Sequence, residues 1–133
     1  MEREKPLGHS RIDFVIHGPK GDTYIEVKTP LISLPASNAV KTAKHSRFDS
    51  FDRLIKHFAD LARSVRNGSR AIVLLCYLYD APPFHPPAPD STSIRIQRAA
   101  RLAEQSGVEN WQVNLKIDKC GVSLIRYLKL KLF

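Results

Sequence analysis

The chain has 133 residues, enough for a single domain, and we expect one domain over residues 1–133. It is 43% hydrophobic and 26% charged, and no stretch approaches the roughly 18 apolar residues of a membrane-spanning helix. The net charge of +8 favours polyanionic partners such as nucleic acid. The charged N-terminus lacks the apolar core of a signal peptide, so we expect a cytoplasmic protein with no membrane partner. Cys76 and Cys120 form no CxxC motif and are expected to be buried thiols.

The first predicted element is a β-hairpin within residues 10–28. Two β-rich stretches, residues 12–17 and 23–28, flank the turn sequence Gly-Pro-Lys-Gly at residues 18–21. Glycine and proline clustered between β-rich stretches are typical of a hairpin turn.

The register of this hairpin decides which side chains meet. If His17 faces Asp22 across the turn, Asp13 lies directly opposite Glu26. Because side chains alternate along a strand, Lys28 then lies on the same face as Glu26. Two carboxylates and one ammonium group are therefore predicted to meet on one side of a two-stranded ribbon.

Such a cluster has two interpretations. Adjacent carboxylates repel each other unless a cation lies between them, and Mg²⁺ typically binds one or two carboxylates together with water and phosphate oxygens. Lys28 would then point at a water molecule beside the metal, which favours phosphodiester hydrolysis. The alternative is a solvated hairpin face on which Asp13 and Glu26 pair with Lys28.

The remaining pattern predicts an α/β fold with alternating helices and strands. A Pro- and Ser-containing loop is expected over residues 29–49, with at most a short strand at 31–34. An apolar stripe predicts a helix over residues 50–67, and a continuous apolar run predicts a central strand over 71–79, buried on both faces. A proline-rich loop at 80–90, a helix over 91–106 and strands over 108–117 and 122–133 complete the chain. Trp111 is expected to be a core residue.

Positive charge is concentrated in the predicted loop and the first helix. These positions lie off the apolar stripe or in the loop, and they either contact phosphates or form an ordinary solvated surface. The candidate nucleic-acid-binding residues are Lys41, Lys44, Arg47, Arg53, Lys56 and His57 from this region, together with Arg11 of the hairpin.

The hairpin sequences SRIDF, residues 10–14, and YIEVK, residues 24–28, closely resemble the C-terminal domain of the sugar fermentation stimulation protein A (SfsA) family. Glu4 and Gly8 match the stretch that precedes the first of these motifs in the family. Residues 53–61 are similar to its first helix. The resemblance spans residues 4 to about 118.

The resemblance implies a restriction-endonuclease-like fold of the PD-(D/E)xK type, with a mixed central sheet flanked by helices. It also implies nuclease chemistry with Mg²⁺ or Mn²⁺, nucleic acid as partner with DNA favoured over RNA, and a role in regulating sugar metabolism genes. Family members usually carry an N-terminal OB-like domain, and we expect none here. By the resemblance, Asp13, Glu26 and Glu4 would bind the metal, Lys28 would orient water, and Lys56 and His57 would approach the phosphate.

The sequence thus predicts a magnesium-dependent, nuclease-like domain acting on DNA or RNA. The alternatives are a non-catalytic DNA-binding or regulatory protein, and a protein–protein contact domain that uses its apolar C-terminal strand. A homo-oligomer is left open.

Overall fold

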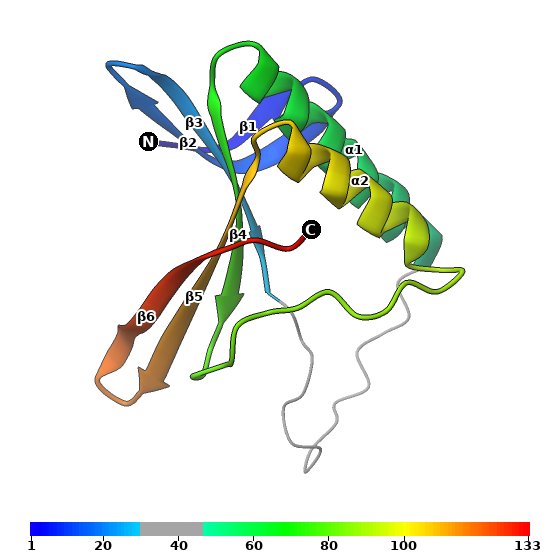
Figure 1. Ribbon diagram of the computed structural model, residues 1–133. Coiled ribbons are helices and arrows are strands. Elements are labelled where there is room, and N and C mark those ends of the chain that lie inside the picture. The colour runs from blue at the N-terminus through cyan, green and yellow to red at the C-terminus, as the bar shows by residue number, and fades with distance from the viewer. Residues whose placement is uncertain (30–46) are drawn as a thin grey trace.

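Six strands form one mixed sheet in the order of the sequence (Figure 1). The computed structural model describes residues 1–29 and 47–133. Strands β1, β2 and β3 are antiparallel, β3, β4 and β5 are parallel, and β6 returns antiparallel to β5. The strands are β1 (Glu2–Leu7), β2 (Ser10–Gly18), β3 (Gly21–Lys28), β4 (Arg70–Tyr77), β5 (Glu109–Asp118) and β6 (Gly121–Leu130). The predicted α/β class is confirmed.

Both helices, α1 (Arg47–Arg66) and α2 (Ile94–Gln105), pack over the same face of this sheet (Figure 1). Each follows a parallel strand and leads to the next one, as parallel pairing requires. Fully buried Ile12 and Leu61 join β2 to α1 in the main core. Helix α1 begins three residues before the predicted start, and Gly68, with φ +92°, follows its end as expected.

The opposite face of the sheet carries neither helix. Strand β4 is therefore buried on the helix side only, and its alternate residues are half-buried, contrary to the predicted burial on both faces. Trp111 is likewise half-buried and lies beside Tyr127 on β6 rather than in the core. Val122 and Leu124 of β6 are 64% and 56% exposed, so the last strand adds little to the core.

Strand β1 was not predicted, because Pro6, Gly8 and four charged residues obscure any strand pattern. Its following turn docks on α1 through Asp60, which is 3% exposed. The Asp60 carboxylate accepts hydrogen bonds from Ser10 Oγ at 2.6 Å and from the backbone N–H of His9 at 3.1 Å. Gly8 has φ +58°, and a Cβ atom there would overlap that carboxylate.

The expected loop over residues 29–49 and its short strand at 31–34 fall mostly outside the described residues. Residues 80–93, here called the strap, lead from β4 to α2 as an extended segment that passes below the two helices in Figure 1. Among the described residues, no helix is both long and apolar enough to span a membrane.

Candidate active site

The candidate site is centred on Glu26, which β3 presents toward the helices. Glu26 pairs in register with Val73 of the central strand and is only 2% exposed. Lys28 Nζ donates to Glu26 Oε1 at 2.5 Å, and His57 Nδ1 of α1 lies 2.5 Å from the same oxygen. Because a carboxylate only accepts hydrogen bonds, His57 Nδ1 carries the hydrogen in this contact. One oxygen of Glu26 thus receives two donors from two different elements.

The second oxygen of Glu26 has no such partner. Oε2 is buried, and among the described residues it is the only buried side-chain nitrogen or oxygen that lacks a hydrogen bond. Burying an unpaired carboxylate oxygen is costly, and such atoms are rare in native proteins. The arrangement therefore leaves one coordination position on a fixed, buried carboxylate.

Asp13 lies at the same end of the hairpin. The observed register confirms the prediction that His17 faces Asp22, and the paired ladder runs as far as Phe14 opposite Ile25. One step further, Asp13 Oδ2 accepts the backbone N–H of Val27 at 2.7 Å, in place of a ladder bond. The Asp13 carboxylate is thereby held against the peptide that directly follows Glu26.

Glu4 has a different environment from the other two carboxylates. It has φ +52°, and the β1–β2 pairing skips it at the position opposite Asp13. Its side chain is 72% exposed and lies 3.7 Å from Arg11. No group of three His, Cys, Asp or Glu side chains within residues 1–29 and 51–133 is close enough to hold a metal. Glu4 as a third ligand stays a prediction.

A cavity of about 300 Å³ opens beside this cluster, between β3 and the start of α1. Lys28, Arg53 and His57 line it together with apolar residues of α1. Among the described residues that line this space there is no carboxylate, and Lys28 and Arg53 bring positive charge to it, which suits an anion such as a phosphate.

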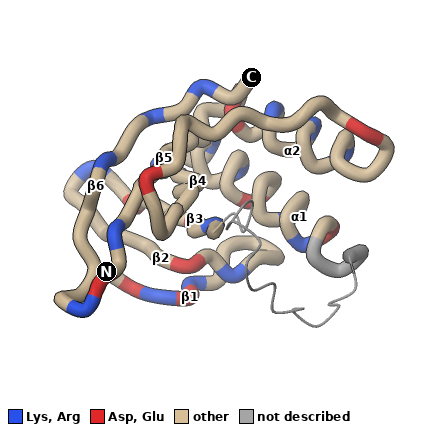
Figure 2. The backbone as a smooth tube through the Cα atoms, turned by 90° about the horizontal axis from the view of Figure 1, so that it is seen from below, with Lys and Arg blue, Asp and Glu red and all other residues tan. Residues whose placement is uncertain are grey.

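The other predicted basic residues are not all brought to this cavity. Lys56 lies exposed on α1, and Arg11 pairs with Glu4. Lys41 and Lys44 lie outside the described residues, as does the side chain of Arg47 at the start of α1. Figure 2 shows basic positions along β1, β6 and both helices, interspersed with acidic ones. The charge on the described chain is therefore spread rather than gathered at one face.

Sequence reasoning missed the burial of His57 and its bond to Glu26. It also missed the buried Asp60, which anchors the first turn of the chain. The missed signal is a polar stripe along one edge of the apolar stripe of α1: His57, Asp60 and Ser64 recur at helical spacing and are all at most 6% exposed.

Comparison with known proteins shows the family to which the chain belongs. The model of the family described as "Sugar fermentation stimulation protein RE domain" matches residues 1–121. The chain belongs to this family. A sugar fermentation stimulation protein homolog of Pseudomonas aeruginosa is 31% identical over 135 residues, covering 99% of this chain and 55% of that protein. A homolog of Pseudomonas fluorescens is 35% identical over 86 residues. The chain spans about half the length of the curated SfsA relatives it matches.

A solved structure agrees with the family assignment. The structure of Pyrococcus furiosus SfsA in complex with Ca²⁺ superposes with a TM-score of 0.66 at 20% identity, covering 99% of this chain and 55% of that one. The superposition and the mixed sheet confirm the restriction-endonuclease-like fold inferred from the hairpin motifs.

Proposed function

We propose that this chain is a nucleic-acid-binding, nuclease-like domain that hydrolyses phosphodiester bonds of DNA or RNA with Mg²⁺ or Mn²⁺. The observation that carries this proposal is buried Glu26, whose Oε1 is bound by Lys28 and His57 while Oε2 has no hydrogen-bond partner among the described residues. A site that serves only to stabilise the fold would satisfy both oxygens.

The donor set fits a hard divalent cation. Glu26 Oε2 is a buried carboxylate oxygen in need of a partner, and the Asp13 carboxylate is fixed at the next peptide. Two carboxylates suffice for Mg²⁺, which usually completes its shell with water and phosphate oxygens. The Pyrococcus furiosus relative was solved with Ca²⁺, another hard cation with oxygen ligands, which supports this assignment. When bound, the cation would stabilise negative charge on the reacting phosphate.

The chain's own residues would orient the substrate around that position. Lys28 donates one hydrogen to Glu26 and has two further N–H groups for a water or a phosphate oxygen. His57 holds the Glu26 carboxylate in place from α1, so it acts as a positioning residue. Arg53 on the cavity wall is suited to binding a phosphate through two parallel hydrogen bonds.

Cleavage assays with Asp13→Asn test this proposal. The amide keeps an oxygen that can accept the Val27 N–H but removes the negative charge. Asp118→Asn is a matched control, because Asp118 Oδ1 accepts a backbone N–H from Cys120 at 2.8 Å in the distant β5–β6 turn. Each protein is incubated with labelled single- and double-stranded DNA and RNA in Mg²⁺, Mn²⁺ or EDTA.

We expect divalent-dependent cleavage by the wild type and by Asp118→Asn, and its loss in Asp13→Asn. Binding to the same strands in EDTA should remain, and should weaken steeply as salt rises. The proposal is wrong if wild-type protein cuts none of these substrates, or if Asp13→Asn cuts as fast as wild type.

The second candidate is a non-catalytic nucleic-acid-binding protein of the same family. It is favoured by the position of Glu4, which pairs with Arg11 and leaves two carboxylates rather than three near the site. Salt-sensitive binding without cleavage in any divalent cation would support this candidate.

A further inference from the structure

An apolar cavity of about 410 Å³ lies directly beside the candidate site. It is lined by residues of β3 and β4, of α1 and α2, of the strap and of the C-terminal segment. Its volume falls within the range of small-molecule sites. Its apolar lining includes Leu54, Phe58, Leu75, Phe84, Ile96 and Phe133.

The walls of this cavity are held by polar contacts. The Phe84 N–H donates to Gln112 Oε1 at 2.8 Å, which fixes the strap over the sheet. Gln97 Nε2 of α2 donates to the Pro87 carbonyl at 2.8 Å. Glu104 accepts the backbone N–H of Leu132 at 3.0 Å, which holds the C-terminal residues against α2. The space is thus preformed, with its frame fixed independently of any occupant.

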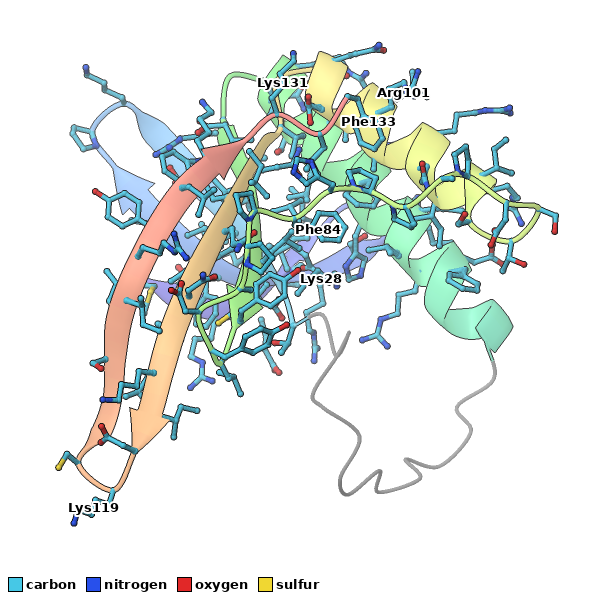
Figure 3. All side chains as sticks on the ribbon, turned by 60° about the horizontal axis from the view of Figure 1, so that its bottom comes forward. Lys28, Phe84, Arg101, Lys119, Lys131 and Phe133 are labelled. Atoms are coloured by element: carbon cyan, nitrogen blue, oxygen red, sulfur yellow. The ribbon has the colours of Figure 1, made fainter. Side chains whose placement is uncertain are left out.

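The apolar cavity adjoins the basic cavity of the candidate site. Lys28 and Leu54 line both, so they form the wall between the two spaces. Figure 3 shows Lys28 and Phe84 close together at the centre of the molecule, with Phe133 further along beside Arg101. One side of this wall carries Arg53 and His57, and the other carries aromatic rings. A ligand that spans both sides needs an anionic part and a flat apolar part.

We propose that the apolar cavity receives an unpaired nucleobase of the bound strand, while the phosphate of that nucleotide lies at Lys28 and Arg53. This inference rests on the nucleic-acid binding proposed above. Proteins that bind single strands combine a positive groove for the backbone with aromatic rings on which bases stack. Because a base in this space must leave its pair, the protein should prefer single-stranded over fully paired substrate.

The test uses binding rather than cleavage, in EDTA, so that it does not depend on metal chemistry. The probes are single-stranded oligonucleotides with 2-aminopurine or an abasic residue at one central position, and a duplex of the same sequence. Affinity is measured by fluorescence anisotropy and base stacking by 2-aminopurine emission. Phe84→Leu keeps an apolar side chain but removes the ring, and Ala100→Phe fills the cavity from α2.

The control is Tyr127→Leu, which removes an aromatic ring that is 68% exposed on β6. We expect the abasic strand and the duplex to bind wild type about tenfold more weakly than the intact strand. Both cavity variants should lose that preference and the change in 2-aminopurine emission, whereas Tyr127→Leu should keep both.

Equal affinity for intact and abasic strands, or cavity variants that behave like wild type, would overturn the nucleobase inference alone. If the protein bound none of the oligonucleotides in a salt-sensitive way, the proposed function would be overturned as well. The two failures are therefore distinguishable. If the cavity instead bound an apolar peptide or an acyl chain, intact and abasic strands would bind with equal affinity.

Discussion

Two groups of buried polar side chains lie on the helix-facing side of one sheet, and they differ in how completely they are hydrogen-bonded. On β5, Gln112 and Asn114 are fully buried, and their side chains bind each other at 2.9 Å. Gln112 also accepts the Phe84 N–H and donates to the Pro82 carbonyl, and Asn114 donates to the Ala81 carbonyl at 2.6 Å. On β3, Glu26 has one oxygen, Oε2, that lacks a hydrogen-bond partner in the part of the chain that the structure describes.

The comparison shows that burial of a polar residue does not by itself indicate a ligand site. The β5 pair is completed by the backbone of the strap, so its role is to position that strap. Lys28 and His57 hydrogen-bond only one oxygen of Glu26, so the other oxygen can still bind a ligand. Substitutions in the two groups should therefore affect different properties.

The largest expected effect is on activity, from Glu26→Gln. The amide keeps an acceptor for Lys28 but loses the charge that the proposed cation needs, so cleavage should fall about 100- to 1,000-fold. The melting temperature of the variant should be close to that of wild type. We expect Mn²⁺ to raise the melting temperature of wild type but not that of the variant. If Glu26→Gln kept its cleavage activity, or failed to fold, the role of Glu26 would be structural, like that of Gln112.

Gln112→Ala should have the opposite profile. It leaves the Phe84 N–H and the neighbouring carbonyls buried without hydrogen-bond partners. The free energy of unfolding should therefore fall by about 2–4 kcal/mol. Urea denaturation measures this loss. The control is Gln97→Ala, which removes a single solvent-exposed hydrogen bond to the strap. It should lower the free energy of unfolding by less than about 1 kcal/mol. Similar costs for both variants would contradict a special role for the β5 pair.

Gly8→Ala tests the anchoring of β1 and β2 to the helix that carries His57. The change forces an L side chain into φ +58° and displaces the Asp60 carboxylate from Ser10, so we expect a loss of about 1–3 kcal/mol in stability. Gly121→Ala separates the two causes, because Gly121 has φ +123° with open space around it. Equal losses would show that backbone strain alone explains the effect.

The smallest effect concerns a charged cluster at the start of β5, away from both polar groups. Hydrogen bonds from Arg70, then from Trp111 and Lys129, lower the pKa of Glu109 to about 2. Because this pKa is below its usual value of about 4.5, the stabilisation is complete above pH 4.5 and is lost as the pH falls toward 2.

The cluster borders solvent, so we expect it to contribute only about 1 kcal/mol. The free energy of unfolding of wild type should exceed that of Glu109→Gln at pH 7, and the difference should shrink between pH 4.5 and 3. A constant difference over this range would contradict the assignment.

The sequence predicts the hairpin half of the site better than the helix half. The register follows from a Gly-Pro-Lys-Gly turn and alternation, so Glu26 and Lys28 could be placed on one face without coordinates. The approach of His57 depends on how α1 crosses the sheet, which no local pattern determines. The buried polar row on β5 was missed because the apolar residues between its members, such as Trp111 and Val113, suggested that the opposite face was buried. They lie instead on the face without helices.

The two cysteines, both expected to be buried, differ in a way that has practical use. Cys76 is half-buried on β4, and desolvation raises the pKa of its thiol, which lowers its reactivity. Cys120 is exposed in the turn between β5 and β6. A maleimide dye should therefore attach at Cys120 first, and this would give a site-specific optical reporter on the native protein with both cavities untouched.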